Sequence, residues 1–337
     1  MKKHIKKIIL FLITLVFLYF VFVNININEF ISAIKGFDIR FIFPLIISCI
    51  ISLSFRALCF KQLISKSVSN PSLPTLIHLC LTSAALNIFL PARAGDIFRA
   101  FYTGSVYKAD KVKIFGTVML ERIFDVVVIF GFLSLGIFVY HNNPLARQLC
   151  AFAGILIVCG LLFAFVTYKF NFMNKVCSYI SKITERFTFS NFIQKCLFQI
   201  NKLCNSFFNG FEAIESPKIL FSTILFATGI WIFECLNFLI VIYGFGLELH
   251  WSVSIFIISF IALACMIPST SIFVGPYQLA VISAFAIYNV SKETALAISL
   301  TEQTIITVIL AVSAVLFLIK NNISYRELKE DIKNNLS

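Results

Sequence analysis

The stretch LNIFLPARAGDIFRAF, Leu86–Phe101, places two arginines and an aspartate in otherwise apolar sequence, just after a proline and beside a glycine. Around it, 59% of the 337 residues are hydrophobic and only 13% are charged, less charge than a soluble protein needs to cover its surface. Several apolar runs could cross a bilayer and do not alternate as barrel strands do, so the sequence predicts an all-α polytopic membrane protein. The fold then depends on whether this charged stretch lies in an aqueous loop or inside the bilayer.

Six apolar runs are expected to be transmembrane helices, and two further apolar regions are interrupted. The six runs are 8–23, 39–60, 114–140, 148–168, 218–243 and 295–319. The interrupted regions are 76–107, broken at Pro91, and 251–290, broken around IPSTSIFVGP at 267–276. The path of these two regions sets the topology of the rest of the chain.

Each interrupted region could either cross the membrane or enter it and return to the same side, and the positions of the lysines and arginines decide between these alternatives. If 76–90 crossed the membrane, the lysines at 108–113 and the basic linker 169–217 would lie outside, against the positive-inside rule. This run has only 15 residues, fewer than the roughly 20 that a full span needs. We therefore predict one transmembrane domain, 1–320, with about six spanning helices and two oppositely oriented re-entrant helical hairpins at 76–107 and 251–290.

The same rule predicts cytoplasmic N and C termini. The basic start MKKHIKK precedes the first apolar run, and NININEF after it offers no cleavage site for a signal peptidase. A short polar tail, 321–337, follows the last run. The linker 169–217 has apolar residues at helical spacing with lysines between them, which predicts amphipathic helices lying on the inner membrane surface or packing against cytoplasmic helix ends.

Composition and missing motifs exclude several classes of function. The net charge of +12 is expected to face the cytoplasm and anionic lipids, not nucleic acid. The ten cysteines are scattered without a C-x-x-C pair, so they predict small buried hydrophobes, not disulfides or metal ligands. Since no Ser-His-Asp set, phosphate-binding glycine loop or zinc motif is present, we expect neither an enzyme nor a cofactor or metal site.

The run 114–140 carries the first part of a charged constellation, in the sequence MLERIFDVV. Glu121 and Asp125 are four residues apart and share a helix face, and Arg122 can pair with Asp125 three residues on. An ionisable group in hydrocarbon costs roughly 2.5 to 3.5 kcal/mol, so each needs a partner or a task. The net negative charge predicts another cation nearby, Arg93 or Arg99, whereas Arg56 is expected to snorkel to the inner surface.

The opening stretch supplies the second part of the constellation. Pro91 and Gly95 bracket a predicted helix start, where free backbone N–H groups attract anions. Arg93 lies in the first turn and Arg99 about two turns further on, with Asp96 expected to hold Arg99 in place. An arginine fork beside a helix N-terminus suits a phosphate. The alternative is that these charges only lock the hairpin against the helix at 114–140.

Further candidates, most of them in the later part of the chain, are expected to have gating or secondary roles. Glu234 lies deep in its span, as a structural partner or a proton carrier. Glu302, with Gln303, is expected to face the level where the second hairpin ends. The other residues of this group are Pro91, Gly95, Pro268, Gly275 and Gln278.

Three motifs together resemble the signatures of the lysylphosphatidylglycerol synthetase transmembrane (flippase-like) family. The motif LPARAGDIFRA matches at Pro91, Arg93, Gly95, Asp96 and Arg99, with Asp96 in place of a glutamate, and LERIFDVV matches at Glu121, Arg122 and Asp125. In IPSTSIFVGPYQLA, Pro268 and Gly275 remain, but Ile272 and Phe273 replace paired glycines and Gln278 replaces the final acid. A proton-coupled step that relied on that acid is therefore not expected.

The resemblance implies movement of lipids or lipid-linked intermediates between leaflets, and we expect a stand-alone membrane domain that does not itself aminoacylate a lipid. We therefore predict an inner-membrane flippase for an anionic phospholipid or a polyprenyl-phosphate type lipid. Arg93 and Arg99 would bind the phosphate, while Asp96, Glu121 and Asp125 position the arginines and Arg122 pairs among them. The alternative is a non-transporting, lipid-binding partner of a glycosyltransferase or other envelope enzyme. A homo-oligomer and such an enzyme partner both stay open.

Overall fold

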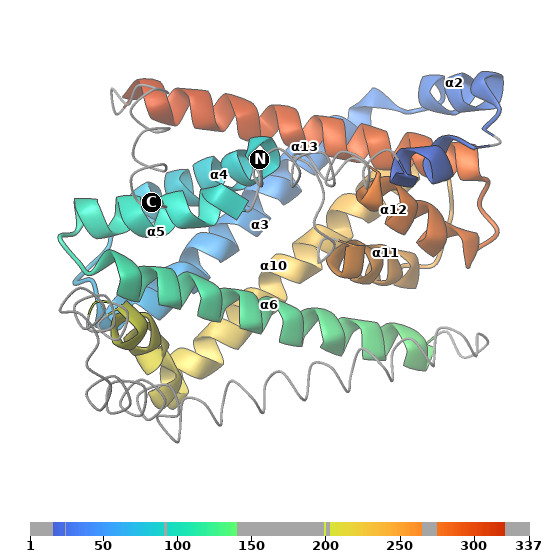
Figure 1. Ribbon diagram of the computed structural model, residues 1–337. Coiled ribbons are helices and arrows are strands. Elements are labelled where there is room, and N and C mark those ends of the chain that lie inside the picture. The colour runs from blue at the N-terminus through green and yellow to red at the C-terminus, as the bar shows by residue number, and fades with distance from the viewer. Residues whose placement is uncertain are drawn as a thin grey trace, which may run out of the picture.

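The computed structural model describes residues 16–23, 25–90, 93–139, 199, 203–264 and 275–320, and all regular structure within them is helical. The long helices are α3 (Ile42–Leu63), α6 (Lys111–Val139), α10 (Pro217–Gly244) and α13 (Lys292–Lys320). The shorter ones are α2 (Ile27–Lys35), α4 (Leu73–Phe89), α5 (Ala94–Val106), α11 (Ser252–Ala264) and α12 (Pro276–Ala286). Figure 1 shows the long helices as a bundle with the short helices packed against them. The expected all-α fold class is confirmed.

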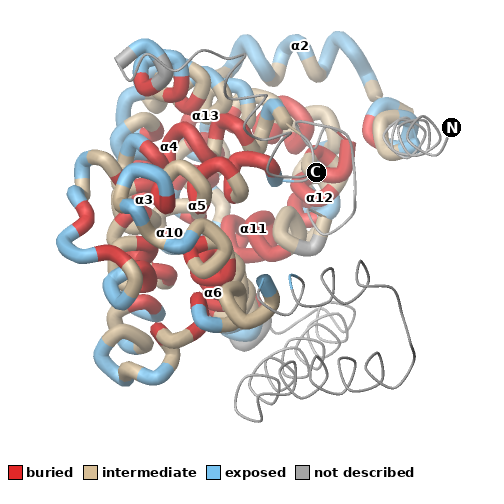
Figure 2. The backbone as a smooth tube through the Cα atoms, turned by 60° about the vertical axis from the view of Figure 1, so that its left-hand side comes forward, coloured by how far each residue is buried: buried red, intermediate tan, exposed pale blue. Residues whose placement is uncertain are grey.

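Three described stretches are long and apolar enough to cross a membrane: Ile39–Lys66, Pro217–Gly244 and Lys292–Phe317. A fourth joins Val16–Phe22 to Ile27–Lys35 if this bent pair is counted as one span. Between 22% and 39% of the most apolar window in each of the three is buried. Most residues of these windows are therefore at least partly exposed, and Figure 2 shows exposed and intermediate residues along the outer helices, as a surface that faces lipid would require. The protein is a membrane protein.

Four of the predicted apolar runs correspond to long helices in the part of the chain that the structure describes. The runs 39–60, 218–243 and 295–319 correspond to α3, α10 and α13, and 114–140 corresponds to α6. The run 148–168, the tail 321–337 and most of the linker 169–217 lie outside the described residues. The count of six spanning helices therefore stays a prediction.

Two pairs of short helices occupy the regions expected to be re-entrant. Figure 1 shows α4 beside α5 in one half of the bundle, and α11 beside α12 in the other half. Helices of 11 to 17 residues extend only about 17 to 26 Å at 1.5 Å per residue, short of a hydrocarbon core of about 30 Å. The paired arrangement fits two hairpins, but helix length does not fix depth in the bilayer, so re-entry stays a prediction.

Gly95 allows α5 to lie directly against α4. A Cβ atom at this position would lie 2.0 Å from the Ser83 carbonyl oxygen and 2.8 Å from Asn87 Oδ1, so any larger residue would push the two helices apart. Gly95 was expected to mark a helix start, and it is the second residue of α5. Its role is to bring the first turn of α5, with Asp96, close to α4.

The described end of the linker packs against the beginning of α6. A helical segment at 203–209 leads into the 3₁₀ helix η4 (Gly210–Glu215). A Cβ at Gly210 would lie 2.3 Å from the Lys113 carbonyl oxygen, and the Phe207 ring lies 6.0 Å from that of Phe115. For these residues the structure favours packing against helix ends, one of the two alternatives that the sequence left open.

Asp110 fixes the start of α6 at this same end of the bundle. Its Oδ1 accepts hydrogen bonds from the backbone N–H groups of Val112 and Lys113, at 2.8 and 3.1 Å, as an N-cap residue does. Burial raises the pKa of the Asp110 carboxyl, but hydrogen bonds from the Ser206 hydroxyl and these backbone groups outweigh it and lower the pKa. The cap therefore holds α6, which carries three charged residues of the predicted site, at a fixed start.

Candidate functional site

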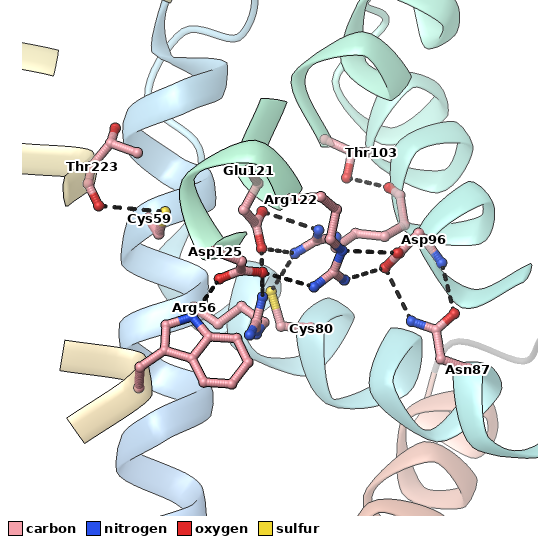
Figure 3. A network of polar contacts seen from close by, with 12 residues as sticks. Arg56, Cys59, Cys80, Asn87, Asp96, Thr103, Glu121, Arg122, Asp125 and Thr223 are labelled. Atoms are coloured by element: carbon pink, nitrogen blue, oxygen red, sulfur yellow. Dashed lines mark hydrogen bonds and ion pairs between the residues drawn. The ribbon is translucent and has the colours of Figure 1, made fainter. Parts of the chain in front are cut away.

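Six charged side chains from three helices meet in the half of the bundle that contains α4 and α5. Arg56 comes from α3, Asp96 and Arg99 from α5, and Glu121, Arg122 and Asp125 from α6. Figure 3 shows Arg56, Asp96 and the three α6 residues pointing toward one another and joined by hydrogen bonds and ion pairs. Five of the six were predicted as site residues from sequence, and the structure brings these five together.

The ion pairs connect the six residues into one network. Arg56 Nη1 lies 3.0 Å from Glu121 Oε1 and 3.1 Å from Asp125 Oδ2. Arg122 contacts Asp96 Oδ1 at 2.7 Å and Asp125 Oδ2 at 3.0 Å. Arg99 Nη2 lies 3.0 Å from Glu121 Oε2. Three arginines therefore compensate three carboxylates, which is how charges are retained in a low-dielectric interior.

Two of the predicted contacts are confirmed. Arg122 pairs with Asp125 across three residues of α6, and Glu121 and Asp125 share a face, since both contact Arg56. The additional cation that their net negative charge required comes in part from the first interrupted region, as Arg99.

Asp96 does not hold Arg99, contrary to expectation. Its carboxylate accepts hydrogen bonds from Arg122 and, at 3.0 Å, from Asn87 Nδ2 of α4. Its backbone N–H donates to Asn87 Oδ1 at 3.2 Å. This clamp between α4 and α5 turns the Asp96 side chain toward α6, so Arg99 takes Glu121 as its partner. Sequence spacing along one helix could not reveal a competing partner on another helix.

Arg56 was expected to snorkel, and this prediction is wrong. Its side chain is 14% exposed and joins Glu121 to Asp125, while Trp231 Nε1 donates to the other oxygen of Asp125 at 3.0 Å. Two carboxylates on one face of α6 attract the guanidinium more strongly than the distant headgroup region does. Counting charges in the sequence could have revealed this role of Arg56, because three buried acids need three cations and Arg56 lies within an apolar run.

Arg99 is enclosed but incompletely hydrogen-bonded. Its side chain is 1% exposed, and its guanidinium lies over the Phe60 ring, 4.5 Å from the ring centroid. Nη1 donates to Glu121 Oε1 at 3.3 Å and to Cys80 Sγ at 3.5 Å. Nε and Nη2 donate no hydrogen bond to any described residue, although Nη2 is within ion-pair distance of Glu121. Unmet buried donors of this kind are costly unless something else accepts from them.

The network borders a cavity of about 340 Å³ in which six helical elements meet. Four arginines line it: Arg56, Arg93, Arg99 and Arg122. The carboxylates that pair with three of them, Asp96, Glu121 and Asp125, are not among the lining residues. The apolar part of the lining includes Leu53, Ile88, Ile306 and Leu310. The cavity is thus amphiphilic, with guanidinium groups presented beside aliphatic side chains.

Arg93 differs from the other three arginines of the cavity. It is the N-cap of α5, one residue before the helix, and has the left-handed backbone conformation with φ 53° and ψ 42°. It is exposed, and among the described residues it forms no ion pair. This conformation costs a non-glycine residue about 1 to 2 kcal/mol. Pro91, expected beside it, lies outside the described residues.

The secondary candidates separate into two places. Glu234 of α10 lines the cavity, and its carboxylate accepts from Ser52 Oγ at 2.7 Å. Glu302 of α13 instead accepts from the Tyr277 hydroxyl of α12, within the second interrupted region; the depth at which it was expected to lie stays a prediction.

A second pair of side chains joins the same two helices. Gln278 Nε2 donates to Gln303 Oε1 at 2.6 Å, and Gln278 Oε1 accepts from the Gly275 backbone N–H at 2.7 Å. Gly275 is the N-cap of α12 with φ 99°. This contact is separate from the cavity, because neither Gln278 nor Glu302 is among the cavity's lining residues. Pro268, Ile272 and Phe273 lie outside the described residues.

Comparison with known proteins identifies the chain at the level of its family. No curated protein and no solved structure matches it significantly. The profile of a family described as "Lysylphosphatidylglycerol synthase TM region" matches residues 7–314, which include both interrupted regions and all six residues of the charged network. The chain therefore belongs to the family of the lysylphosphatidylglycerol synthase TM region.

Proposed function

We propose that this protein is a lipid transporter that moves an anionic phospholipid or a polyprenyl-phosphate type lipid between the leaflets of the inner membrane. The observation that carries the proposal is the cavity lined by four arginines inside a membrane domain. Ionisable side chains inside a membrane domain are costly to maintain, and they usually mark a functional site. Membership of a membrane-domain family named for a lipid synthase supports the lipid class.

Phosphate is the group that best fits the donors of this cavity. The carboxylates of the network already neutralise Arg56, Arg99 and Arg122, whereas Arg93 forms no ion pair with any residue that the structure describes. Arg99 contributes an Nε donor that forms no hydrogen bond with the described residues, and an Nη2 donor whose partner there is Glu121, at ion-pair distance. Guanidinium groups bind phosphate oxygens through paired N–H donors, which a single ammonium group cannot match. A volume of about 340 Å³ suits a headgroup, so the hydrocarbon chains would stay in the lipid.

The arrangement of the short helices suggests how the site could be reached from both leaflets. With termini in the cytoplasm and six spanning helices, α4–α5 and α11–α12 would be re-entrant hairpins that enter from opposite sides. Paired broken helices that meet near the membrane centre are common in transporters. In this proposal the protein performs no chemical reaction, and the substrate crosses unchanged.

Leaflet exchange in proteoliposomes tests this function. Fluorescent phosphatidylglycerol is incorporated, and dithionite quenching measures how fast the inner-leaflet label reaches the outer leaflet. We expect exchange to be faster than in protein-free vesicles. Arg93→Gly, which keeps the left-handed backbone but removes the charge, should slow exchange about tenfold or more, since a charge-assisted hydrogen bond contributes about 1.5 to 3 kcal/mol. Arg93→Lys should retain more activity than Arg93→Gly.

Arg40→Gln is the matched control. Its side chain is 87% exposed and pairs with Asp38 outside the cavity, so exchange should be unchanged. Equal rates in the parent and in folded Arg93→Gly would contradict the assigned role of Arg93. Co-purified lipid detected by native mass spectrometry, with no exchange above background, would instead favour the non-transporting lipid-binding partner.

A further inference from the structure

Glu234 is the acidic residue that lines the arginine cavity. It lies in the middle of α10, a helix apolar enough to span the membrane. Its Oε1 accepts from Ser52 Oγ at 2.7 Å, and its Oε2 lies 3.5 Å from Asn237 Nδ2. The side chain is only partly buried, so it can respond to whatever occupies the cavity.

Glu234 differs from the other three acids near the cavity. Asp96, Glu121 and Asp125 each form an ion pair with an arginine, whereas Glu234 forms none among the described residues. Counting these groups gives four arginines against four carboxylates, so the cavity and its network have no net charge when Glu234 is ionised. A phosphodiester monoanion entering the cavity would therefore leave one uncompensated negative charge in a low-dielectric region.

The groups around Glu234 come from several helices, and none of them would compensate the negative charge that the phosphodiester adds. Arg56 of α3 interacts electrostatically with Glu234 but already pairs with two acids. Glu302 of α13 interacts with Glu234 as a like charge. Cys49 of α3 and Cys235 of α10 lie within electrostatic range, and Arg93, Arg99 and Arg122 line the same cavity. The Asn237 amide faces Glu234 through Nδ2, at 3.5 Å from Oε2, while its Oδ1 is buried and accepts no hydrogen bond from the described residues.

We propose that Glu234 takes up one proton when a phosphate group binds in the arginine cavity. This inference rests on the proposed anion site and adds a coupling ion to it. The proton comes from water and forms an O–H bond on the Glu234 carboxylate, while the phosphodiester remains a monoanion. Binding then leaves the total charge of the cavity and its network at zero, and a flip of the Asn237 amide would turn Oδ1 toward the new hydroxyl as an acceptor. Lipid and proton would cross together, so a proton gradient could drive the movement.

The coupling fixes the sign of the pH dependence. Anion binding and protonation favour each other, so phosphate affinity should rise as pH falls, by at most about tenfold per pH unit for one proton. A glutamine at position 234 has the shape of the protonated acid, so Glu234→Gln should bind the anion at least as well as the parent. Its affinity should not change with pH.

Proton uptake on binding is the direct test. Dioctanoyl phosphatidylglycerol is added to purified protein in weakly buffered detergent solution that contains a pH indicator dye. We expect about one proton taken up per lipid bound by the parent and none by Glu234→Gln. Glu248→Gln changes an exposed acid outside the cavity and should behave as the parent does. Uptake should be equal in choline and sodium buffers, and a requirement for sodium would overturn the proposal.

Other outcomes separate this inference from the proposed function. Uptake that persists in Glu234→Gln, or that is lost in Glu302→Gln instead, overturns the role of Glu234. If Glu234→Gln fails to fold, the parent still decides, because an affinity that is constant between pH 5 and 8 overturns the coupling. Lipid exchange without proton uptake leaves the transport function standing and refutes the coupling. Binding with uptake but without exchange supports the coupling and refutes transport.

Discussion

Arg93 and Arg56 show how differently two arginines are used in one membrane domain. Arg56 lies in a continuous helix and closes the charge balance of Glu121 and Asp125. Arg93 lies at a helix break with positive φ, exposed and outside the ion-pair network of the described residues. A strained backbone is retained where the surrounding structure enforces it, often at binding sites. The first arginine is therefore structural in the main, and the second is available to a ligand.

Replacing Arg56 tests the structural half of this distinction. Arg56→Met keeps an unbranched apolar side chain in place of the arginine's methylene stem. It removes the guanidinium group and so leaves Glu121 and Asp125 short of one cation. Removing one partner of a buried ion pair typically costs about 3 to 5 kcal/mol. We expect Arg56→Met to lower the free energy of unfolding in detergent by about 3 kcal/mol or more, measured by chemical denaturation.

Arg40→Met is the control, because Arg40 forms an exposed pair with Asp38 and such pairs contribute about 1 kcal/mol or less. Similar stability losses in the two variants would mean that the buried network does not depend on Arg56. A double variant, Arg56→Met with Asp125→Asn, should recover part of the loss, since it also removes the excess negative charge of the network.

At the scale of the helices, the length of the apolar runs predicted the long described helices, whereas the topology inferred from the lysines stays a prediction. The runs 39–60, 218–243 and 295–319 reappear as α3, α10 and α13, because about 20 apolar residues have few stable alternatives to a helix in a membrane. The partners of Asp96 were not predictable in this way. They depend on how closely α4 approaches α5, which is a property of packing between helices and not of periodicity within one helix.

Gly95 makes this close approach possible, so it offers a test at the element scale. In Gly95→Ala the new methyl group would overlap the Ser83 carbonyl oxygen at 2.0 Å, and the first turn of α5 must move away from α4. Overpacking typically costs about 1 to 3 kcal/mol. Here the Asn87–Asp96 hydrogen bonds, at 3.0 and 3.2 Å, should be lost as well. We expect a lower melting temperature and weaker binding of dioctanoyl phosphatidylglycerol.

Gly131→Ala is the matched glycine variant in α6. A Cβ there would meet nothing within 4 Å, and alanine favours a helix over glycine by about 1 kcal/mol. The melting temperature of Gly131→Ala should stay the same or rise slightly. If Gly95→Ala also left the melting temperature and lipid binding unchanged, close packing of α4 on α5 would not be needed to form the site.

At the scale of the whole molecule, the cavity is where the first and last parts of the chain meet. Its lining comes from α3 and α4, from α5 and α6, and from α10 and α13, so helices distant in sequence contribute to one site. One apolar core cluster lies around α10, α11 and α12, and another around α4, α5 and the start of α6. A ligand in the cavity would therefore contact helices from the early and the late part of the chain at once.

This position predicts that a bound phosphate stabilises the entire domain. A ligand that binds only the folded state adds about 2.7 kcal/mol at 100 times its dissociation constant. We expect the melting temperature to rise saturably with dioctanoyl phosphatidylglycerol but not with dioctanoylglycerol, which has the same chains without phosphate. Moderate salt should reduce the effect only partly, because buried pairs are screened less than surface charges. Arg93→Gly should shift the titration to higher lipid concentration, whereas equal stabilisation by both lipids would show that the chains, not the phosphate, occupy the site.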